Sequence, residues 1–370
     1  MPEPKLGFHA VILAGGRGTR FWPRSRTRTP KQLLKIIGKT SMLEQTVARL
    51  RPLISPDRIW SVTNAEQAVA LRKQLPPPAR KRILAEPAAK NTTAAIALAA
   101  IHIRHASHGD ALMAVLPADH FIAKPERYHE IVKNALDFAR HPGRIVVLGI
   151  PPRFPETGYG YVERAGESLT TRGCPVFAVG RFTEKPEVAL AKEYVASGNY
   201  HWNAGMFFWR VSTYLDALKE FLPQTHTALE ELARHIGKRS YEAQLRRIYP
   251  KLENISVDYA ILERATRSPG EPRVFVIPAE IGWSDVGSWA AVYELQAKQP
   301  GDNVFAGPGQ TLDAEGNFFW VPGKFVAAIG VHDLIVVETP DALLICPRDR
   351  AQDVGKIVKG LEARNQKDLF

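Results

Sequence analysis

The segment HAVILAGGRGTR, residues 9–20, decides the fold of this chain. Its apolar first half, residues 9–13, predicts the first strand of an α/β domain. The glycines that follow let the backbone adopt conformations that a Cβ would block and approach a ligand closely. Their free N–H groups can also point at phosphate oxygens. Because Arg24, Arg26, Arg28 and Lys31 add further positive charge, the segment predicts a loop that binds a nucleoside triphosphate.

Two common phosphate motifs do not match this loop. A Walker A loop requires a Lys-Ser/Thr pair after its last glycine, whereas Gly18 is followed by Thr19 and Arg20. The dinucleotide fingerprint requires a third glycine that opens a helix, but Phe21 stands at that position and Pro23 disfavours a helix just after it. A plain glycine turn with solvated arginines is the simpler alternative. The ordered run of residues up to Lys31 argues against that alternative.

Composition limits the class of protein. The chain has 370 residues, more than a single core usually serves, so two domains are expected. Its 45% apolar and 24% charged residues are typical of a globular protein. The two cysteines, Cys174 and Cys346, lie far apart and no secretory signal precedes the first strand. These features predict a cytoplasmic protein without disulfides, and no apolar run is long enough to span a membrane.

The net charge of +11 is compatible with nucleic acid, an anionic membrane or phosphorylated small molecules as partners. The aromatic and basic signatures of RNA-binding modules are absent, and so is any Cys/His spacing typical of zinc sites. The densest basic cluster lies in the glycine loop. We therefore expect small phosphorylated ligands, and neither nucleic acid nor a membrane as partner.

Apolar strand patterns and helix patterns alternate through the first half of the chain, and this alternation favours a doubly wound, mainly parallel sheet. Strands are predicted at residues 11–13, 58–63, 82–85, 112–116 and 145–149. Helices are predicted at residues 41–51, 65–74, 91–105 and 126–140. Ser41 and Glu44 have the spacing of a capping box at the first of these helices.

The second half is more mixed. Shorter strands are predicted within residues 158–182, followed by a helix at 187–197, a strand at 202–210, helices through 211–264, a strand at 274–277 and a helix at 286–297. A break near residues 299–302 divides the chain into a domain of residues 1–298 and a β module of residues 299–370. Short strands of this module are expected at 318–321, 326–330, 334–337 and 342–345, before a helix at 351–364.

The segment from Leu13 to Lys31 resembles the signature of the sugar-1-phosphate nucleotidyltransferases. Its continuations WPRSR (residues 22–26) and PKQ (residues 30–32) are similar to the mannose-1-phosphate guanylyltransferase branch. Further segments match that branch in order over about residues 8–295: EPAAKNT (86–92), LPADH (116–120), GYGY (158–161), FTEKP (182–186), WNAGMF (202–207), SVDY (256–259) and WSDVGSW (283–289). As an ordered set they are far more specific than any single motif.

The resemblance implies a Rossmann-like, mainly parallel but mixed sheet flanked by helices, of the nucleotide-diphospho-sugar transferase type, with a short C-terminal β-helix. It implies transfer of GMP from GTP to α-D-mannose 1-phosphate, giving GDP-mannose and pyrophosphate, by Mg²⁺-assisted in-line attack. The chain is too short for the isomerase barrel that longer relatives carry. The β module makes a homodimer the expected assembly.

The resemblance also implies a catalytic set of Arg20, Lys31, Asp119 and Asp285. Asp119 follows an apolar strand, at the sheet edge where open α/β sheets bind ligands, and is expected to hold Mg²⁺ together with Asp285. Mg²⁺ prefers oxygen ligands, usually one or two carboxylates plus phosphates. Arg20 and Lys31 are expected to grip the triphosphate and neutralise the leaving pyrophosphate. Taken alone, each aspartate is compatible with a cap or turn residue.

The remaining site residues are assigned by the same resemblance. The nucleotide is expected to contact Leu13, Ala14, Gly15, Gly16, Gly18, Thr19, Arg20, Lys31, Glu86, Pro87, Asn91 and Asp119. The sugar phosphate is expected to contact Gly160, Glu184, Lys185, Asn203 and Asp258. Without the resemblance, Glu184 and Lys185 are better explained as a solvated ion pair. Thr92 and Thr93 are candidate helix caps, and His120 and Trp22 are expected to be structural.

Two alternatives remain open at this point. One is a related enzyme that uses another nucleotide or sugar phosphate, since the preference for guanine and mannose rests on the resemblance alone. The other is a noncatalytic regulator that binds a sugar nucleotide. Loss of the metal carboxylates or of Lys31 would indicate a regulator, but Asp119, Asp285 and Lys31 are all present.

Overall fold

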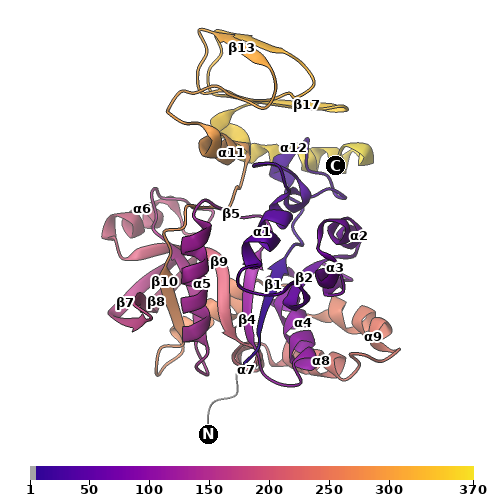
Figure 1. Cartoon of the computed structure of the whole chain (residues 1–370), viewed down its shortest axis with the longest axis vertical. Helices are drawn as coiled ribbons and strands as arrows, with labels where there is room; N and C mark the ends of the chain where they lie inside the picture. The colour runs from indigo at the N-terminus through magenta and orange to yellow at the C-terminus, as the bar shows by residue number, and fades with distance from the viewer. Residues whose placement is uncertain (1–5) are drawn as a thin grey trace.

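The computed structural model describes residues 6–370, and its largest element is a mixed sheet of nine strands (Figure 1). The order across this sheet is β3-β2-β1-β4-β9-β6-β10-β8-β7. The strands are β1 (Phe8–Leu13), β2 (Ile59–Asn64), β3 (Ile83–Glu86), β4 (Leu112–Pro117), β6 (Ile145–Ile150), β7 (Gly160–Thr171), β8 (Cys174–Glu184), β9 (Tyr200–Arg210) and β10 (Val274–Pro278). Residues 1–5, which begin the predicted domain of residues 1–298, lie outside the described residues.

Most strands of the sheet run in one direction. Strands β1, β2, β3 and β4 pair in parallel, and β6 pairs in parallel with β10. Strand β9 lies antiparallel between β4 and β6, and β8 lies antiparallel between β10 and β7. Only β9 and β8 therefore oppose the common direction, so the mixed and mainly parallel sheet expected from the sequence is confirmed.

Helices cover both faces of this sheet, which explains why its strands β4, β6 and β10 are almost entirely apolar. One face packs against α4 (Asn91–Ala106), α7 (Val211–Phe221), α8 (Pro223–Ala233) and α9 (Tyr241–Ile248). The other packs against α1 (Met42–Leu50), α2 (Ala65–Gln74), α5 (Pro125–Ala139) and α6 (Val188–Ser197). Val11 contributes to the first core, whereas its neighbours Ala10 and Ile12 contribute to the second, as alternation along a strand requires.

Local signals account for several helix boundaries. The predicted capping box is present at α1, where the Ser41 hydroxyl accepts from the Glu44 N–H and the Glu44 carboxylate accepts from the Ser41 N–H. Asn64 caps α2 in the same way, by accepting from the Gln67 N–H at 2.9 Å. Leu75 ends α2, and the prolines after it start the short helix α3 (Pro77–Arg80).

The C-terminal module lies beyond the carboxyl ends of the parallel strands (Figure 1). Its strands are β12 (Val304–Phe305), β13 (Gly309–Leu312), β14 (Phe318–Trp320), β15 (Val326–Ile329), β16 (Leu334–Thr339) and β17 (Ala342–Pro347). Strands β12, β14 and β16 stack in parallel, and so do β13 and β15, which is the pattern of successive β-helix turns. The buried Asn317 side chain joins these turns by donating to Asn303 Oδ1 and to the Val331 carbonyl.

A third core joins this module to the first domain. Trp22 of the glycine-loop segment and Trp289 of α11 (Trp289–Gln296) pack there with Val354 and Val358 of α12 (Val354–Ala363). The Trp289 indole donates to the Trp22 carbonyl at 3.1 Å, and the Trp22 indole donates to the Leu369 carbonyl at 2.7 Å. The structural role expected for Trp22 is therefore confirmed, and the segment after the glycine loop packs with the C-terminal residues as one unit.

Several sequence expectations need correction. Residues 158–182 form two long strands, β7 and β8, because they pair with each other over most of their length. The helix expected at 286–297 begins at Trp289, and the one expected at 351–364 begins at Val354 after a 3-10 segment, Arg348–Asp353. Strands β12 and β13 were missed, as was the two-residue pairing of β5 (Phe121–Ile122) with β11 (Trp283–Ser284). A further short helix, α10 (Glu263–Arg267), lies between α9 and β10.

No helix within residues 6–370 has the combination of length and apolar character needed to cross a membrane.

Candidate active site

Two adjoining cavities open at the carboxyl ends of the parallel strands. The first has a volume of about 560 Å³, and ten of the predicted site residues line it: Leu13, Gly15, Gly16, Glu86, Asn91, Gly160, Glu184, Asn203, Asp258 and Asp285. The second has about 1180 Å³, and its lining includes Arg20 and Gln352. Tyr159, Trp283 and Asp285 line both, so the cavities meet at these side chains.

A buried glutamine holds the glycine loop in place through hydrogen bonds to its backbone. Gln32 is buried, and its amide donates to the Ala14 carbonyl at 2.8 Å and to the Gly16 carbonyl at 3.0 Å. Gly18 has a φ of 62°, and a Cβ on it would lie 2.3 Å from the Cβ of Lys31. The loop can therefore fold back onto Lys31 only because residue 18 is glycine.

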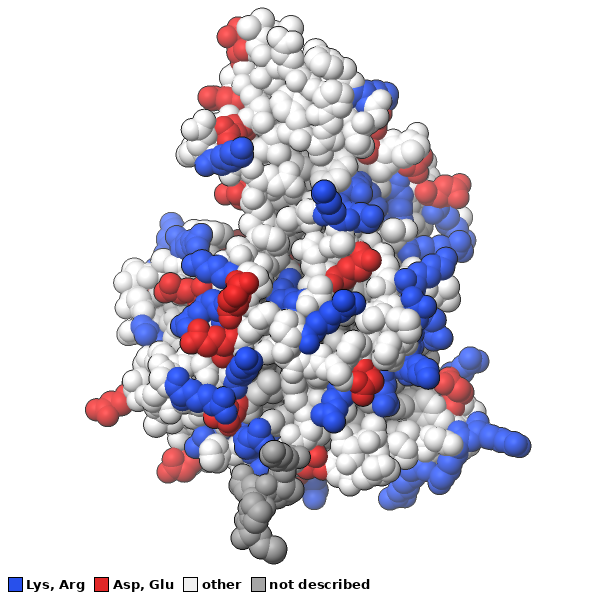
Figure 2. All heavy atoms as spheres, in the orientation of Figure 1, with Lys and Arg blue, Asp and Glu red and all other residues white. Residues whose placement is uncertain are grey.

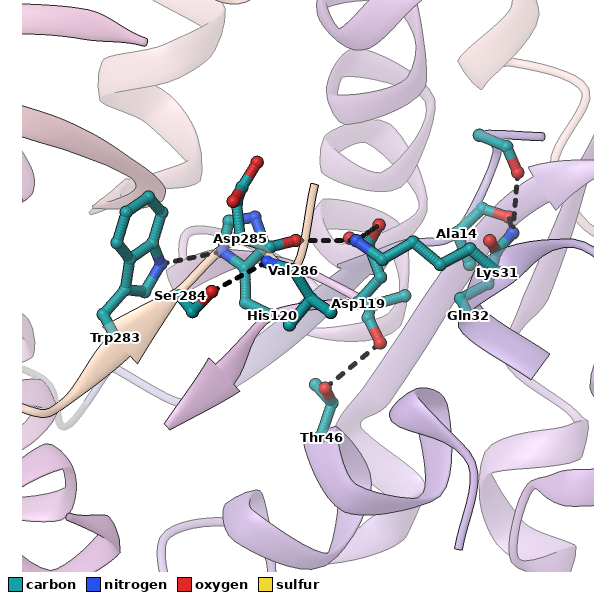
Figure 3. A network of polar contacts seen from close by, with 12 residues as sticks. Ala14, Lys31, Gln32, Thr46, Asp119, His120, Trp283, Ser284, Asp285 and Val286 are labelled. Atoms are coloured by element: carbon teal, nitrogen blue, oxygen red, sulfur yellow. Dashed lines mark hydrogen bonds and ion pairs between the residues drawn. The ribbon is translucent and has the colours of Figure 1, made fainter. Parts of the chain in front are cut away.

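Lys31 joins the two residues predicted to hold the metal, as Figure 3 shows. Its ammonium lies 2.8 Å from Asp119 Oδ2 and donates to the backbone carbonyl of Asp285 at 2.6 Å. Burial is the largest single influence on the pKa of Asp119 and raises it, but the charges of Lys31 and His120 and the hydrogen bonds to the carboxylate together outweigh burial, so the net shift is downward. Asp119 is therefore ionised at neutral pH, next to a buried cation.

A tight turn presents the carboxylate of Asp285. Tyr159 donates a hydrogen bond to Asp285 Oδ1 at 2.7 Å, and burial and the Asp285 charge raise the pKa of the tyrosine. Val286 adopts a φ of 48°, and a Cβ on Gly287 would lie 2.7 Å from Asp285 Oδ2. The sequence after Asp285 thus leaves space for its carboxylate to face the cavities.

The donor set fits a hard divalent cation such as Mg²⁺. Residues 6–370 contain no cluster of three or more His, Cys, Asp or Glu that could hold a metal by itself. Asp119 and Asp285 supply carboxylate oxygens from two segments that Lys31 ties together. Mg²⁺ usually binds through one or two carboxylates together with substrate phosphates and water, so two carboxylates beside a phosphate-binding loop are a suitable set.

The opposite end of the first cavity is acidic. Asn203 donates to Asp258 Oδ1 at 2.9 Å, and burial together with the negative charge of Glu184 raises the pKa of Asp258 to about 7. Glu184 lies 3.1 Å from the ammonium of Lys185, whose side chain is 60% exposed. A Cβ on Gly160 would lie 2.5 Å from Glu184 Oε2, so only glycine fits there.

Glu86 and Asn91 line the first cavity together with the glycine loop. Tyr249 donates to Glu86 Oε1 at 2.6 Å, and burial raises the pKa of Glu86. Asn91 begins α4 with a φ of 62°, and its side chain accepts from the Thr92 N–H. Thr92 does not cap this helix, because its hydroxyl accepts instead from the Val257 N–H at 2.9 Å. That contact ties α4 to the segment that carries Asp258.

Some predicted site residues line neither cavity: Ala14, Gly18, Thr19, Lys31, Pro87, Asp119 and Lys185. Lys31 and Asp119 still reach the site through their contacts with Asp285 and with each other. Ala14 is buried, and its carbonyl accepts from Thr63 and Gln32. His120, expected to be structural, lines the first cavity and accepts from the Trp283 indole at 3.1 Å.

Sequence reasoning gave no role to Tyr159, Gln32 or Gln352. Tyr159 and Gln32 lie inside quoted motifs, so their positions beside Gly160 and Lys31 were a usable signal. Gln352 carries no such signal, because it reaches Arg20 from 332 positions along the chain.

A glycine loop with cations at the ends of parallel strands, beside two carboxylates and a cavity, is the arrangement of a nucleotidyltransferase. Consistent with this class, the family model described as "Nucleotidyl transferase" matches residues 9–300. A second model, "MannoseP isomerase/GMP-like beta-helix domain", matches residues 310–361.

Similar proteins narrow the class. The mannose-1-phosphate guanylyltransferase of Escherichia coli K12 is 38% identical over 371 residues, covering 98% of this chain and 75% of the relative. The alginate biosynthesis protein AlgA of Pseudomonas aeruginosa is 36% identical, covering 97% of this chain and 73% of the relative. A Thermus thermophilus structure titled "mannose-1-phosphate geranyltransferase" has a TM-score of 0.85 at 33% identity, covering 96% of this chain and all of that one. The chain belongs to the mannose-1-phosphate guanylyltransferase family of nucleotidyltransferases.

Proposed function

We propose that this protein transfers GMP from GTP to α-D-mannose 1-phosphate and releases pyrophosphate. The observation that carries the proposal is the position of Lys31 between Asp119 and Asp285. Asp285 lines both cavities, so the two reacting phosphates would meet beside this cluster. The names of the similar guanylyltransferases support GTP and mannose 1-phosphate as the substrates.

The nucleotide occupies the end of the cavity that β1 and β3 form. In this arrangement the base and ribose lie against Leu13, Ala14, Gly15, Gly16, Glu86, Pro87 and Asn91. The triphosphate follows the loop through Gly18 and Thr19 toward Arg20 and Lys31, whose charges match its oxygens. Arg20 lines the larger cavity, so the pyrophosphate end of the nucleotide points into it.

The sugar phosphate occupies the acidic end. Sugar hydroxyls form hydrogen bonds with the side chains of Glu184, Asn203 and Asp258, and Gly160 lets the sugar ring come close to the backbone. Lys185 binds the 1-phosphate. Because its side chain is mostly exposed and paired with Glu184, Lys185 must turn toward the cavity when the anion binds.

Asp119 and Asp285 hold the Mg²⁺ of this proposal. When bound, the ion draws negative charge from phosphate oxygens and so allows two anions to approach each other. Tyr159 fixes the orientation of the Asp285 carboxylate. Lys31 keeps Asp119 ionised and adds positive charge at the same place.

The reaction needs little covalent chemistry from the protein. An oxygen of the sugar phosphate attacks the α-phosphorus of GTP, and the bond from that phosphorus to pyrophosphate breaks on the opposite side. Arg20 and Lys31 stabilise the charge that accumulates on the leaving pyrophosphate. Catalysis therefore comes from positioning and electrostatics, as in other phosphoryl transfers.

The decisive experiment is pyrophosphate release with Mg²⁺, crossing GTP, ATP, UTP and dTTP against mannose 1-phosphate and glucose 1-phosphate. We expect GTP with mannose 1-phosphate to dominate. A different best pair would keep the mechanism and change the substrates. No release with any pair, from folded protein that still binds GTP, would indicate a noncatalytic regulator instead.

Asp119→Ala provides the internal check of this mechanism. Loss of a carboxylate that holds the metal should reduce kcat by at least about 10³-fold while the fold is kept. Asp313→Ala is a suitable control, since Asp313 is exposed in the β module. A folded Asp119→Ala enzyme with near-normal turnover would remove Asp119 from the mechanism.

We further propose that residues 1–298 form the catalytic domain, and that two copies of the chain associate through residues 299–370 to form a homodimer. Five large apolar side chains of the module are between 54% and 68% exposed: Leu312, Phe325, Ile329, Leu343 and Ile345. Leu312 and Ile329 are paired neighbours on β13 and β15, and Figure 2 shows few charged side chains on the module. Such a surface is suited to a second copy of the chain.

Sedimentation of the protein tests the dimer. The combined Leu312→Asp and Ile329→Asp changes should convert a dimer into a monomer, because two carboxylates would be buried in the interface. Val69→Asp, at an exposed apolar residue of α2, should leave the assembly unchanged. A wild-type protein that sediments as a monomer would contradict this assignment.

A further inference from the structure

The 3-10 segment before the C-terminal helix reaches the glycine loop. Arg20 donates from Nη1 to Oε1 of Gln352 at 2.6 Å, across 332 positions of sequence. Gln352 belongs to the segment Arg348–Asp353 that leads into α12. Both side chains line the larger cavity together with Tyr159 and Asp285. The β module therefore contributes a polar group to the wall of the candidate active site.

The backbone packing keeps this contact in place. A Cβ on Gly355 would lie 3.5 Å from Thr19 Oγ1 and 3.8 Å from Arg20 Cγ, so α12 approaches the loop closely. Phe21, directly after Arg20, is buried in the same core as Val354 and Val358. Because both segments are anchored by this core, Gln352 remains within reach of Arg20.

The two arginines of the loop have different partners. Arg17 pairs with the carboxylate of Glu362 at 2.5 Å, which neutralises its charge. Arg20 bonds instead to the neutral amide of Gln352, and in residues 6–370 no carboxylate lies within ion-pair distance of it. A neutral acceptor can orient a guanidinium without cancelling its charge, and it leaves the remaining N–H groups free for phosphate oxygens.

We propose that Gln352 is a positioning residue for nucleotidyl transfer, which holds the Arg20 guanidinium toward the larger cavity for the pyrophosphate part of the nucleotide. This inference rests on the proposed function. The contact is exposed, so it contributes little to folding stability. Its effect is to restrict Arg20 to the orientation that phosphate binding needs, which lowers the entropic cost of binding.

Two substitutions separate positioning from packing. Gln352→Met keeps the length of the side chain and removes the hydrogen bond. Gln352→Glu keeps an acceptor but adds a charge that competes with phosphate for Arg20. The matched control is Gln244→Met on α9, which removes another exposed glutamine–arginine hydrogen bond, from Arg247 Nε at 2.7 Å; neither Gln244 nor Arg247 lines the two cavities.

The readouts are calorimetric binding of GTP and of pyrophosphate, with steady-state kinetics in both directions. Gln352→Met should weaken pyrophosphate binding about five- to tenfold, the usual effect of one hydrogen bond, and should leave the KM for mannose 1-phosphate within about twofold. Gln352→Glu should weaken pyrophosphate binding more than Gln352→Met does. Gln244→Met should match the wild type, and all variants should keep their Tm.

Unchanged pyrophosphate affinity in Gln352→Met, or wild-type affinity in Gln352→Glu, would overturn this inference. An equal loss of affinity for pyrophosphate and for mannose 1-phosphate would also overturn it, because that result indicates a general disturbance of the site. Failure of the proposed function is distinguishable, since the wild-type chain would then release no pyrophosphate from any substrate pair.

Discussion

The two ends of the first cavity are built in opposite ways. The proposed nucleotide end lies at the carboxyl ends of parallel strands and offers glycine backbone, with the cation Lys31 close by at Asp285. The sugar end lies on the antiparallel strands β7, β8 and β9 and offers Glu184, Asn203 and Asp258. One end therefore complements phosphate charge, whereas the other complements uncharged hydroxyl groups.

This difference explains how one cavity can bind two ligands in a single arrangement, each at its own end. A triphosphate placed at the acidic end would face Glu184 and Asp258, and like charges repel. Sugar hydroxyls placed at the Lys31 end would not supply the negative charge that the cations Lys31 and Arg20 attract, so phosphate is favoured there. Electrostatic repulsion, as well as attraction, thus determines which ligand binds at which end of the cavity.

The cationic end should carry the largest effect. Lys31→Met removes the charge that pairs with Asp119 and the donor to the Asp285 carbonyl. We expect kcat to fall about 10²–10³-fold. The pKa of Asp119 should rise, because the positive charge that counteracts the effect of burial on this carboxyl group is gone. Steady-state kinetics and a pH–rate profile measure both effects. Lys35→Met, at an exposed lysine nearby, should behave as the wild type.

The acidic end should show a selective effect on the sugar substrate. Glu184→Gln should raise the KM for mannose 1-phosphate about 10–100-fold, because a carboxylate–hydroxyl bond is lost and Lys185 loses its partner. The KM for GTP should change less than about twofold. Glu167→Gln, on the exposed part of β7, is the control. A comparable loss for both substrates would break the division into two ends.

Tyr159, at the junction of the two cavities, should give a smaller effect. Tyr159→Phe keeps the edge-to-face contacts with Trp202 and Trp283 but removes the hydrogen bond to Asp285. We expect kcat to fall about three- to tenfold, with a higher Mg²⁺ concentration needed for half-maximal rate. Metal titration of binding, as well as of activity, checks this. An unchanged metal requirement would show that Asp285 needs no help from Tyr159.

The smallest effect concerns pH and stability. The pKa of Asp258 is raised to about 7 in the folded protein, above the ordinary value near 4. The stabilisation from its bound proton is therefore complete below about pH 4 and is lost as pH rises to about 7. Between pH 5 and pH 8 the wild-type Tm should fall by a few degrees relative to that of Asp258→Asn. Parallel curves for the two proteins would show that Asp258 does not titrate in this range, and Asp313→Asn serves as the control.

The first half of the fold could be predicted because its signals are local. Strands β1, β2, β3, β4 and β6 are continuous apolar runs, and the capping residues Ser41 and Asn64 mark helix starts. Strands β7 and β8 looked like shorter pieces, since they are half exposed and interrupted by register shifts. Which strands pair, and that β9 inserts between β4 and β6, depends on contacts between distant segments.

The candidate site likewise contains residues that local sequence could predict and residues that it could not. The glycine loop, Lys31 and Asp119 could be proposed from motif and position, and the structure brings Lys31 and Asp119 together. Ala14 shows the limit of a motif, because its carbonyl is used inside the fold by Gln32 and Thr63. Gln352 shows another limit, since a single hydrogen bond across 332 positions leaves no trace in local sequence.

The packing of α12 on the glycine loop also has a consequence for the order of events during protein synthesis. The ribosome makes the loop of residues 15–20 near the start, yet Gln352, Gly355 and Leu369, which contact residues 19, 20 and 22, are made near the end. Domains generally fold as they emerge, so the sheet can form while the loop still lacks these partners. A growing chain would therefore acquire its full affinity for nucleotide only late in translation, after the strands that carry the loop have folded.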